Sequence, residues 1–425
     1  MSGPAAGSTG TGHAYADTAW EKRCAHAWGR EPVHATGVTP PVNAAEAFGT
    51  AVRMSGPFRA GARPRSVSAV RFFTVDGRLA APGALLPTEE DLDRDRYADR
   101  LDRELGGKGW LLTIRHPFVL NFDRWARTRD ALAGLWRRAG WPALPLTAEL
   151  SFGHGCSASA PAPGTDVLTW VLGGTFGPGA RAGDVLYRPA ASAPDDAGEM
   201  YRDRAAVLRI LVPTDPTTAL PAVRTVLLDL VRRDPLADRA MPYLPYPPPE
   251  NPDGSTPVAG EFAEVADVLR RVIDGPDAEL ERAVRRRWAA RRSAAGLEPV
   301  PEPRPATDLG PGADSRVRLG AQVLRVPEGA NREVWAVNGL LLPVRGTLAA
   351  RVLAELDPER PITVRDLLAR VGAAGHPARE DGVLALLRAL YRTRALDPVD
   401  PGEPLDPGEP LDPDGPSAPK TETQP

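Results

Sequence analysis

Residues 166–174 have the sequence DVLTWVLGG, in which β-branched and aromatic residues lead up to two glycines. This composition favours a β-strand, and Gly173-Gly174 is its expected end. Three similar stretches surround it, at 146–152 (LTAELSF), 185–187 (VLY) and 205–212 (AAVLRILV). Short strands that are separated by glycine and proline predict an antiparallel barrel or sandwich.

A helical region precedes these strands. Residues 91–105 are dominated by charge and predict a helix, and 109–114 (GWLLTI) predicts a short buried strand. Asn121 then begins an amphipathic helix that ends at Gly140, because apolar residues recur at steps of three and four. That apolar stripe consists of Phe122, Trp125, Leu132, Leu135 and Trp136. We expect the stripe to pack in the core.

The chain after residue 315 predicts a second, smaller fold. Residues 317–326 alternate like a strand, and 334–342 can pair with them. Thr363 is a suitable N-cap with Asp366 at the third helical position. Three short helices are expected at 346–356, 363–371 and 379–391. Short helices with small strands are typical of a winged-helix module.

Proline and glycine are unusually frequent, with 47 prolines and 41 glycines in 425 residues. Ordinary proteins have about 12% of the two together, so part of this chain must be linker or tail. Residues 1–14 lack apolar bulk, 241–260 contain seven prolines, and the acidic end repeats the sequence DPGEPL. We expect the two ends to be disordered and 241–260 to be a linker or surface loop.

Composition also bounds the class of protein. The net charge of −3 excludes a protein that holds nucleic acid by charge alone. No apolar run approaches the roughly 20 residues of a membrane span, and no signal peptide is visible. Two cysteines, Cys24 and Cys156, cannot form a disulfide framework, so a cytoplasmic location is expected. Arginine greatly outnumbers lysine, which suggests a GC-rich bacterial genome.

Three segments carry a resemblance to a known family. Residues 183–189 (GDVLYRP) resemble the strand before the last metal-binding histidine of bacterial JmjC-type cupins, the ribosomal-oxygenase-like group. Residues 166–174 resemble the strand after that family's first metal motif, and 26–32 (HAWGREP) resemble its entry segment. The family also carries a C-terminal winged helix. The resemblance implies hydroxylation of protein side chains that depends on Fe(II) and 2-oxoglutarate.

The same resemblance implies an α+β chain. Its parts are a double-stranded β-helix of the cupin/JmjC type, a helical linker region and a C-terminal winged-helix-like domain. The expected divisions are a disordered segment at 1–14, the cupin/JmjC-like domain at 15–240, Pro-rich loops with a helical segment at 241–315, the winged-helix-like domain at 316–398 and a disordered acidic tail at 399–425.

The residues that the resemblance implies for iron binding are missing. The family uses two histidines and one carboxylate, which leave three coordination positions open for 2-oxoglutarate and oxygen. The corresponding positions here hold Pro161, Pro163 and Pro194. No histidine stands between Gly155 and Gly375. We therefore expect no cofactor, and the alternative is Fe(II) with 2-oxoglutarate at an atypical site.

The sequence also offers residues for a metal site of another kind. His154 and Cys156 are two residues apart, so on a strand they point to the same face. Asp195 stands with Asp196 and Glu199 where the last ligand is expected. The alternative interpretation is a loop histidine, a small buried thiol and solvated acids.

Four residues are candidates for contact with a ligand. Arg209 can meet a carboxylate through two hydrogen bonds, and Tyr187 and Trp170 can line a pocket. Glu149 can act as a general base if it points into the barrel. The alternatives are solvent-facing charges at Arg209 and Glu149, and core packing for the two aromatic residues.

The expected function is a JmjC/cupin-like protein without a working Fe(II)/2-oxoglutarate site that binds a protein or peptide. One alternative is a protein or peptide hydroxylase with an atypical metal site, and another is an assembly factor that contacts its partner through the winged helix. Six arginines within 282–292 either bind RNA or an acidic peptide or form a solvated helix face. We expect no membrane and no sequence-specific DNA as partners, and a homodimer remains open.

Overall fold

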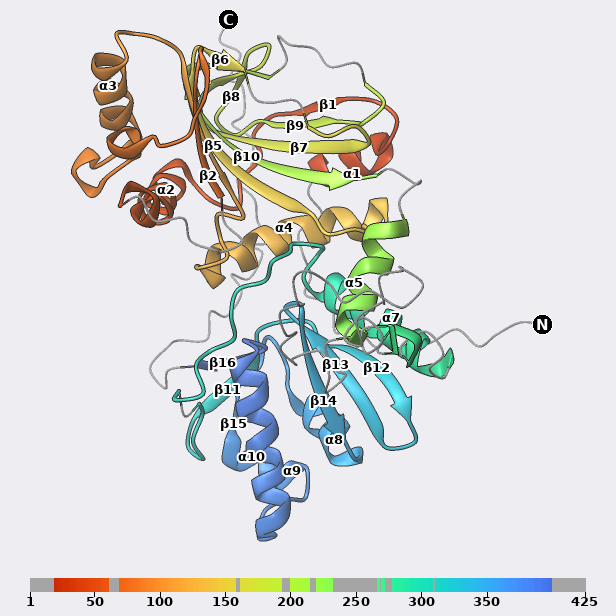
Figure 1. Cartoon of the computed structure of the whole chain (residues 1–425). Helices are drawn as coiled ribbons and strands as arrows, with labels where there is room; N and C mark the ends of the chain where they lie inside the picture. Colours follow the sequence, from red (N-terminus) through yellow and green to blue (C-terminus); the bar gives the residue numbers. More distant parts are fainter. Residues whose placement is uncertain are drawn as a thin grey trace, which may run out of the picture.

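The computed structural model describes residues 19–60, 69–157, 161–192, 199–214, 219–231, 266–267, 269–271, 277–308 and 310–399. The segments expected to be disordered or linking, 1–14, 241–260 and 400–425, lie outside the described residues. Figure 1 shows an N-terminal body with a large sheet and a C-terminal body with smaller sheets. The helix α4 (Phe122–Ala139) runs between them. No described helix is both long and apolar enough to cross a bilayer.

The N-terminal body is built on one antiparallel sheet. Its strand order is β1-β9-β7-β10-β5-β4-β2-β3, and the short strands β6 and β8 pair with β10 and β7. The strands in chain order are β1 (Val33–Ala35), β2 (Ala69–Thr74), β3 (Gly77–Leu79), β4 (Trp110–Arg115), β5 (Thr147–His154), β6 (Cys156–Ser157), β7 (Thr165–Phe176), β8 (Ala180–Arg181), β9 (Val185–Arg188) and β10 (Met200–Pro213). Mixed helices and antiparallel strands confirm the predicted α+β class.

Even-numbered residues of the central strands form one face of this sheet, which we call the outer face. They meet the helices α1 (Ala19–Ala27), α2 (Ala44–Arg59), α3 (Arg94–Glu104) and α4 in a single apolar core. Trp170 of β7 packs edge-on against Trp20 of α1, with ring centroids 5.8 Å apart. Each large apolar side chain that is fully buried here contributes about 1.5–3 kcal/mol. This core packs the outer face of the sheet against the helices, and the opposite face is left for a functional site.

Helix α4 confirms the predicted amphipathic helix. The Asn121 side chain accepts a hydrogen bond from the Arg124 backbone N–H at 3.0 Å, which caps the helix. The helix ends at Gly140, whose φ of 100° is favourable only for glycine. Leu132 and Trp136 of the predicted stripe are buried.

The predicted end of the strand at Gly173-Gly174 is wrong. Strand β7 continues to Phe176, and its pairing with β10 shifts register opposite these glycines. Gly174 has a φ of 67°, and a Cβ there would lie 2.5 Å from the carbonyl oxygen of Asp203. The glycines therefore allow a β-bulge, with a close approach of two backbones, in place of a chain end.

The C-terminal body contains two small sheets and three helices. The sheets have the orders β15-β11-β16 and β12-β13-β14. The elements are β11 (Arg316–Leu319), β12 (Leu324–Gly329), β13 (Arg332–Val337), β14 (Leu340–Arg345), α8 (Thr347–Glu355), β15 (Ile362–Thr363), α9 (Val364–Arg370), α10 (Pro377–Arg392) and β16 (Leu396–Val399). The Thr363 hydroxyl accepts a hydrogen bond from the Asp366 backbone N–H at 3.1 Å, which confirms the predicted cap.

Both predicted strands of this body are divided in the structure. The stretch 317–326 separates into β11 and β12, which belong to different sheets. The stretch 334–342 turns back at Asn338-Gly339, where φ is 51° and 80°. Two adjacent residues with positive φ form the tight turn whose twist suits a hairpin, and Asn-Gly is its typical sequence.

The arginine run of 282–292 lies on α7 (Asp277–Ser293) beside α5 (Ala219–Val231). Arg286 pairs with Glu328 of β12, and both Arg287 and Arg291 pair with Glu298. The other pairings of the run are Arg285 with Glu281 at 2.6 Å and Arg292 over the Trp141 ring at 5.1 Å. The run therefore holds the junction of the two bodies together and is not simply a solvated face.

The two bodies also touch through side chains of α4. Arg129 donates a hydrogen bond to the Asn338 side chain, and the Trp136 indole donates to the Ala295 carbonyl at 3.0 Å. The Arg394 guanidinium lies 4.7 Å from the centroid of the Phe122 ring. Helix α4 thus contacts the large sheet on one side and the C-terminal body on the other.

Candidate functional site

A cavity of about 230 Å³ lies on the face of the large sheet opposite the helices, which we call the inner face. Every strand residue that lines it has an odd number. Successive side chains of a strand point to opposite faces, so these odd-numbered residues share one face. We call this cavity the inner-sheet cavity. Its polar lining within the described chain consists of Arg71, Thr113, Arg115, Thr147, Glu149, Thr165 and Arg209.

Strand register brings the charged residues together. Arg115 of β4 lies opposite Glu149 of β5, and Glu149 lies opposite Arg209 of β10. Arg71 of β2 lies opposite Thr113, two residues before Arg115. Four strands that are separate in sequence therefore place alternating charges in adjacent positions of one sheet.

These charges form a buried ion network. The two terminal nitrogens of Arg209 bind Glu149 at 3.4 Å and Glu199 at 3.0 Å. Arg115 also reaches Glu149, at 3.4 Å, and Arg188 binds the other oxygen of Glu199 at 2.5 Å. The Arg209 side chain is 3% exposed, whereas that of Arg115 is 39% exposed. The network therefore extends from the floor of the cavity to solvent.

The cations of the cavity outweigh its anions. Burial lowers the pKa of Arg209, but Tyr201, Glu199 and Glu149 outweigh this effect and hold its pKa above the usual value. Burial and then the nearby Arg115 lower the pKa of Arg71. Arg71 has no ion pair in the described part of the chain, and its buried Nε lacks a hydrogen-bond partner there. The cavity is therefore a positively charged environment.

Arg209 and Glu149, two of the residues singled out from the sequence, both lie in this cavity. The solvent-facing alternative is wrong for both, because 3% and 7% of these residues are exposed. Both terminal nitrogens of Arg209 pair with protein carboxylates, so its guanidinium group does not meet a ligand carboxylate directly. Its buried Nε has no partner with normal hydrogen-bond geometry among the described residues.

Trp170 and Tyr187 lie on the opposite, outer face of the sheet. Tyr187 stacks on Trp28 with ring centroids 4.4 Å apart, and its hydroxyl donates to Asp166 at 2.7 Å. The same hydroxyl accepts a hydrogen bond from the backbone N–H of Gly29 at 2.6 Å. Both aromatic residues belong to the core with the helices, so the structure does not place them in the inner-sheet cavity.

Of the candidate metal residues His154, Cys156 and Asp195, the structure describes the first two. His154 ends β5 and Cys156 begins β6, where Cys156 pairs with Tyr201 of β10. Burial raises the pKa of the Cys156 thiol, which opposes the thiolate form that binds metals. Asp195 and Asp196 lie outside the described residues. Among the described residues, no group of three or more histidines, cysteines and acids is arranged to hold a metal ion.

The inner-sheet cavity does not fit the iron site of the family that the sequence resembles. Pro161 lines the cavity and Pro163 stands nearby in sequence, and proline side chains offer no donor atom to a metal. Glu149 is the acid in its described lining, and two arginines occupy its carboxylate. A site with two histidines and a carboxylate cannot be assembled from these residues.

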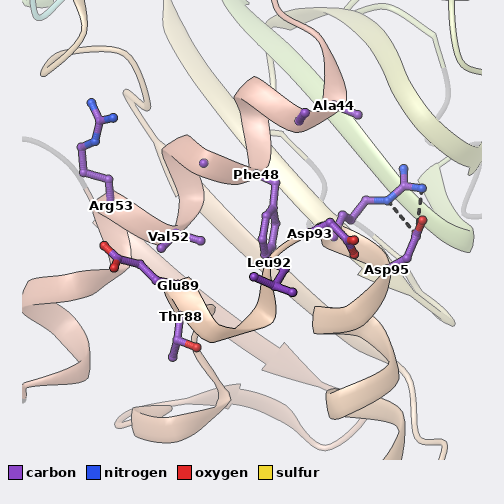
Figure 2. Close-up of a pocket in the computed structure, with 12 residues that line it drawn as sticks. Ala44, Phe48, Val52, Arg53, Thr88, Glu89, Leu92, Asp93 and Asp95 are labelled. Atoms are coloured by element: carbon purple, nitrogen blue, oxygen red, sulfur yellow. Dashed lines mark hydrogen bonds and ion pairs between the residues drawn. The ribbon is translucent and has the colours of Figure 1, made fainter.

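A second, larger pocket lies between α2 and the 3-10 turn η2 (Glu89–Asp91) that precedes α3. It has a volume of about 490 Å³, and Figure 2 shows Phe48 of α2 pointing toward Leu92. In its pair of Arg94 and Asp95, the Asp95 side chain is 63% exposed, so solvent screens the interaction. The smaller inner-sheet cavity has the buried charges that mark functional sites more often, and we therefore take it as the candidate site.

Sequence reasoning missed Arg71 and Arg115 altogether. Each is a charged residue that follows apolar residues in a strand, as in Val70-Arg71-Phe72. An arginine inside a short apolar run is the available signal, because such a side chain must find water or a partner. Which partner it finds depends on strand register, which a single sequence does not display.

Comparison with known proteins returns solved structures only. No protein-family model matches the chain, and no curated protein matches its sequence. The chain is similar to YcfD, a ribosomal oxygenase from Escherichia coli, in complex with cobalt and succinic acid, at 16% identity and a TM-score of 0.44. That match covers 90% of this chain and 99% of YcfD. YcfD in complex with cobalt and 2-oxoglutarate matches over the same shares at 16% identity and a TM-score of 0.43.

YcfD is described as a ribosomal oxygenase, the group whose motifs the sequence resembles. An identity of 16% with a TM-score of 0.44 carries no argument about the fold family or the function of this chain. Cobalt, succinic acid and 2-oxoglutarate are ligands of YcfD, and the likeness carries no argument about the chemistry of this chain.

Proposed function

We propose that this chain is a JmjC/cupin-like protein that does not use Fe(II) and 2-oxoglutarate and that acts in the cytoplasm by binding a protein or peptide. One observation carries the proposal. The inner-sheet cavity, which is lined by Pro161 at one of the positions that the resemblance gives to iron ligands, holds the ion network of Arg115, Glu149 and Arg209, with Glu199 behind Arg209.

Electrostatics supports this proposal independently of the missing histidines. The described lining has three guanidinium groups and one carboxylate, so a divalent cation would meet net repulsion. The same charge distribution attracts an anionic group. A cavity that repels metal cations and reaches solvent through Arg115 suits recognition better than metal-dependent oxidation.

Iron analysis of the purified protein tests the proposal. We expect less than stoichiometric iron and no turnover of 2-oxoglutarate after incubation with Fe(II). One iron per chain that is lost in a His154→Ala variant would contradict the proposal. That outcome would favour the alternative, a Fe(II)/2-oxoglutarate-dependent protein or peptide hydroxylase with an atypical site.

We also propose that the C-terminal body is a winged-helix-like module that contacts protein and not DNA. Its strand β11 lies between β15 and β16, which flank the helices α9 and α10 in sequence. Helix α10 carries Glu380 and Asp381 in its first turns, and Glu380 accepts a hydrogen bond from the Gly375 N–H at 2.7 Å. Acids at this end of a recognition helix would repel phosphates.

Gel shift of the full chain with duplex DNA at low salt tests the second proposal. We expect no stable complex. Tight binding with a steep dependence on salt would contradict it, because such a dependence reports contacts to phosphates. A variant with Glu380→Gln and Asp381→Asn is the matched comparison, and any DNA binding should increase in it.

A further inference from the structure

We propose that the inner-sheet cavity binds an acidic side chain of an extended partner peptide, whose carboxylate is held by Arg71 and Arg115. This inference rests on the proposed function, since it names the chemistry of the partner. It needs neither iron nor 2-oxoglutarate.

The distribution of ion pairs identifies the arginines that remain available. Both terminal nitrogens of Arg209 are engaged by Glu149 and Glu199. Among the described residues, the ion pair of Arg115 is a long contact of 3.4 Å to Glu149, a carboxylate that it shares with Arg209. Arg71 has no ion pair within the described chain. The positive charge that a ligand can neutralise is therefore that of Arg71 and Arg115.

The register of β2 and β4 places these two arginines as diagonal neighbours. Arg71 lies opposite Thr113, and Arg115 is two residues further along β4. Diagonal residues of adjacent antiparallel strands are about 7–8 Å apart, within reach of long side chains. Two guanidinium groups can then donate to the two oxygens of one carboxylate, in charge-assisted hydrogen bonds that are roughly twice as strong as neutral ones.

The size of the cavity favours a side chain over a drug-sized molecule. Its volume of about 230 Å³ is below the roughly 300–1,000 Å³ of pockets that enclose drug-sized ligands. Thr113, Thr147 and Thr165 add hydroxyl groups to its wall. A glutamate or aspartate can insert its carboxylate here while the peptide backbone stays outside. We therefore assign the carboxylate to a peptide.

The free protein has an electrostatic reason to bind such a group. Burial, Arg115 and Arg78 together lower the pKa of Arg71, which means that its charge is poorly compensated. The buried Nε of Arg71 has no hydrogen-bond partner in the described chain. An anion in the cavity would offset both deficits.

Fluorescence anisotropy with the full-length protein tests the inference. The probe is a fluorescein-labelled peptide Ser-Gly-Glu-Gly-Glu-Gly-Ser, and the control peptide has glutamine in place of both glutamates. We expect binding of the first peptide only. Arg71→Gln and Arg115→Gln should each weaken it by about tenfold or more, since each removes a charge-assisted hydrogen bond. Arg370→Gln on α9, an exposed residue of the C-terminal body, is the matched control and should change it less than about twofold.

Thermal melting separates recognition from a structural role. An Arg71 that serves the fold would lower the melting temperature when replaced. An Arg71 kept for a ligand should leave the melting temperature of Arg71→Gln unchanged or raise it, because an uncompensated charge is removed. Equal peptide affinity in wild type and Arg71→Gln, or a large fall in melting temperature without loss of affinity, would overturn the inference.

Two further arms identify the source of the carboxylate. Free glutarate should compete only weakly with the peptide. Effective competition at equal concentration would mean that the ligand of the cavity is a small acid and not a peptide side chain. A chain that ends at residue 399 should bind the peptide like the full chain. Binding that appears only after this truncation would assign the cavity to the chain's own acidic tail and overturn the partner peptide. Iron is measured on the same sample. Stoichiometric iron would overturn the proposed function. Iron-free protein that does not bind the peptide would overturn this inference alone.

Discussion

Helix α7 and the inner face of the large sheet both gather arginines, but these arginines meet different partners. On α7 the side chains of Arg286, Arg287 and Arg291 pair with acids of the following segment and of β12. On the sheet, Arg71 has no ion pair within the described chain and Arg115 has a shared, long one. The dense run is therefore a structural junction, and the scattered set forms the positively charged cavity.

The difference teaches how charge in a sequence relates to binding. Residues of one helix lie on the same or adjacent faces, so a run of arginines needs nearby acids to be compatible with packing. Strands bring arginines together from distant segments, and the excess of positive charge is then visible only across the sheet. The number of arginines in a stretch of sequence is thus a poor guide to which arginines remain available to a ligand.

The largest effect is expected from breaking the α7 junction. Glu298→Ala should cost about 3 kcal/mol of unfolding free energy, because it leaves Arg291, whose side chain is 5% exposed, without its carboxylate. Urea unfolding measures this loss. Glu281→Ala removes the partner of the exposed Arg285 and should cost less than about 1 kcal/mol. Equal losses in the two variants would mean that the run is a solvated face.

Smaller effects are expected at the floor of the cavity, where one substitution should lower the unfolding free energy and tighten peptide binding. Glu149→Gln should lower the unfolding free energy by about 1–3 kcal/mol, since Arg209 is buried and keeps only Glu199 as a charged partner. The same change frees Arg115 and should tighten binding of the acidic peptide. Glu104→Gln, which touches an exposed pair with Arg100, should change neither quantity appreciably. Weaker peptide binding in Glu149→Gln would count against a cationic site.

The smallest effect concerns the histidine next to Arg115. Burial and then Arg115 lower the pKa of His116 below its usual value. The unfolded chain therefore binds a proton more readily than the folded one, and stability should fall as the pH drops below about 6.5. Arg115→Gln should raise the pKa of His116 and reduce this loss.

Proton NMR titration of the His116 ring, identified with a His116→Asn variant, measures that pKa directly. Arg78→Gln is the control and should leave it unchanged. An unaltered pKa in Arg115→Gln would mean that Glu149 neutralises Arg115 fully. Arg115 would then be paired as completely as the arginines of α7.

Local signals in the sequence predicted local structure well. The cap at Asn121, the cap at Thr363 and the central strands are determined by residues within a few positions of each other. Gly173-Gly174 misled because glycine serves a bulge as readily as a strand end. Asn338-Gly339 was an available hairpin signal inside a stretch taken as one strand.

The candidate site could be predicted only in part. Arg209 and Glu149 attracted notice because each is a charge in an apolar strand, and both line the cavity. Arg71 was missed because its significance depends on Arg115 lying diagonally across β4, a relation set by register. Trp170 and Tyr187 have the residue types of a pocket wall, but alternation along β7 and β9 turns them to the helix-covered face.

The turn at Asn338-Gly339 has a consequence for how this sequence can vary. The Asn338 amide donates to the carbonyls of Thr393 and Arg394 at 2.9 and 3.0 Å and accepts from Arg129 of the other body. Glycine would keep the turn and lose all three bonds, and aspartate would lose the two donated ones. A Cβ at position 339 would lie 2.3 Å from Val300. In homologues that keep the two bodies docked, Asn338 and Arg129 are therefore expected to change together, and position 339 to stay glycine.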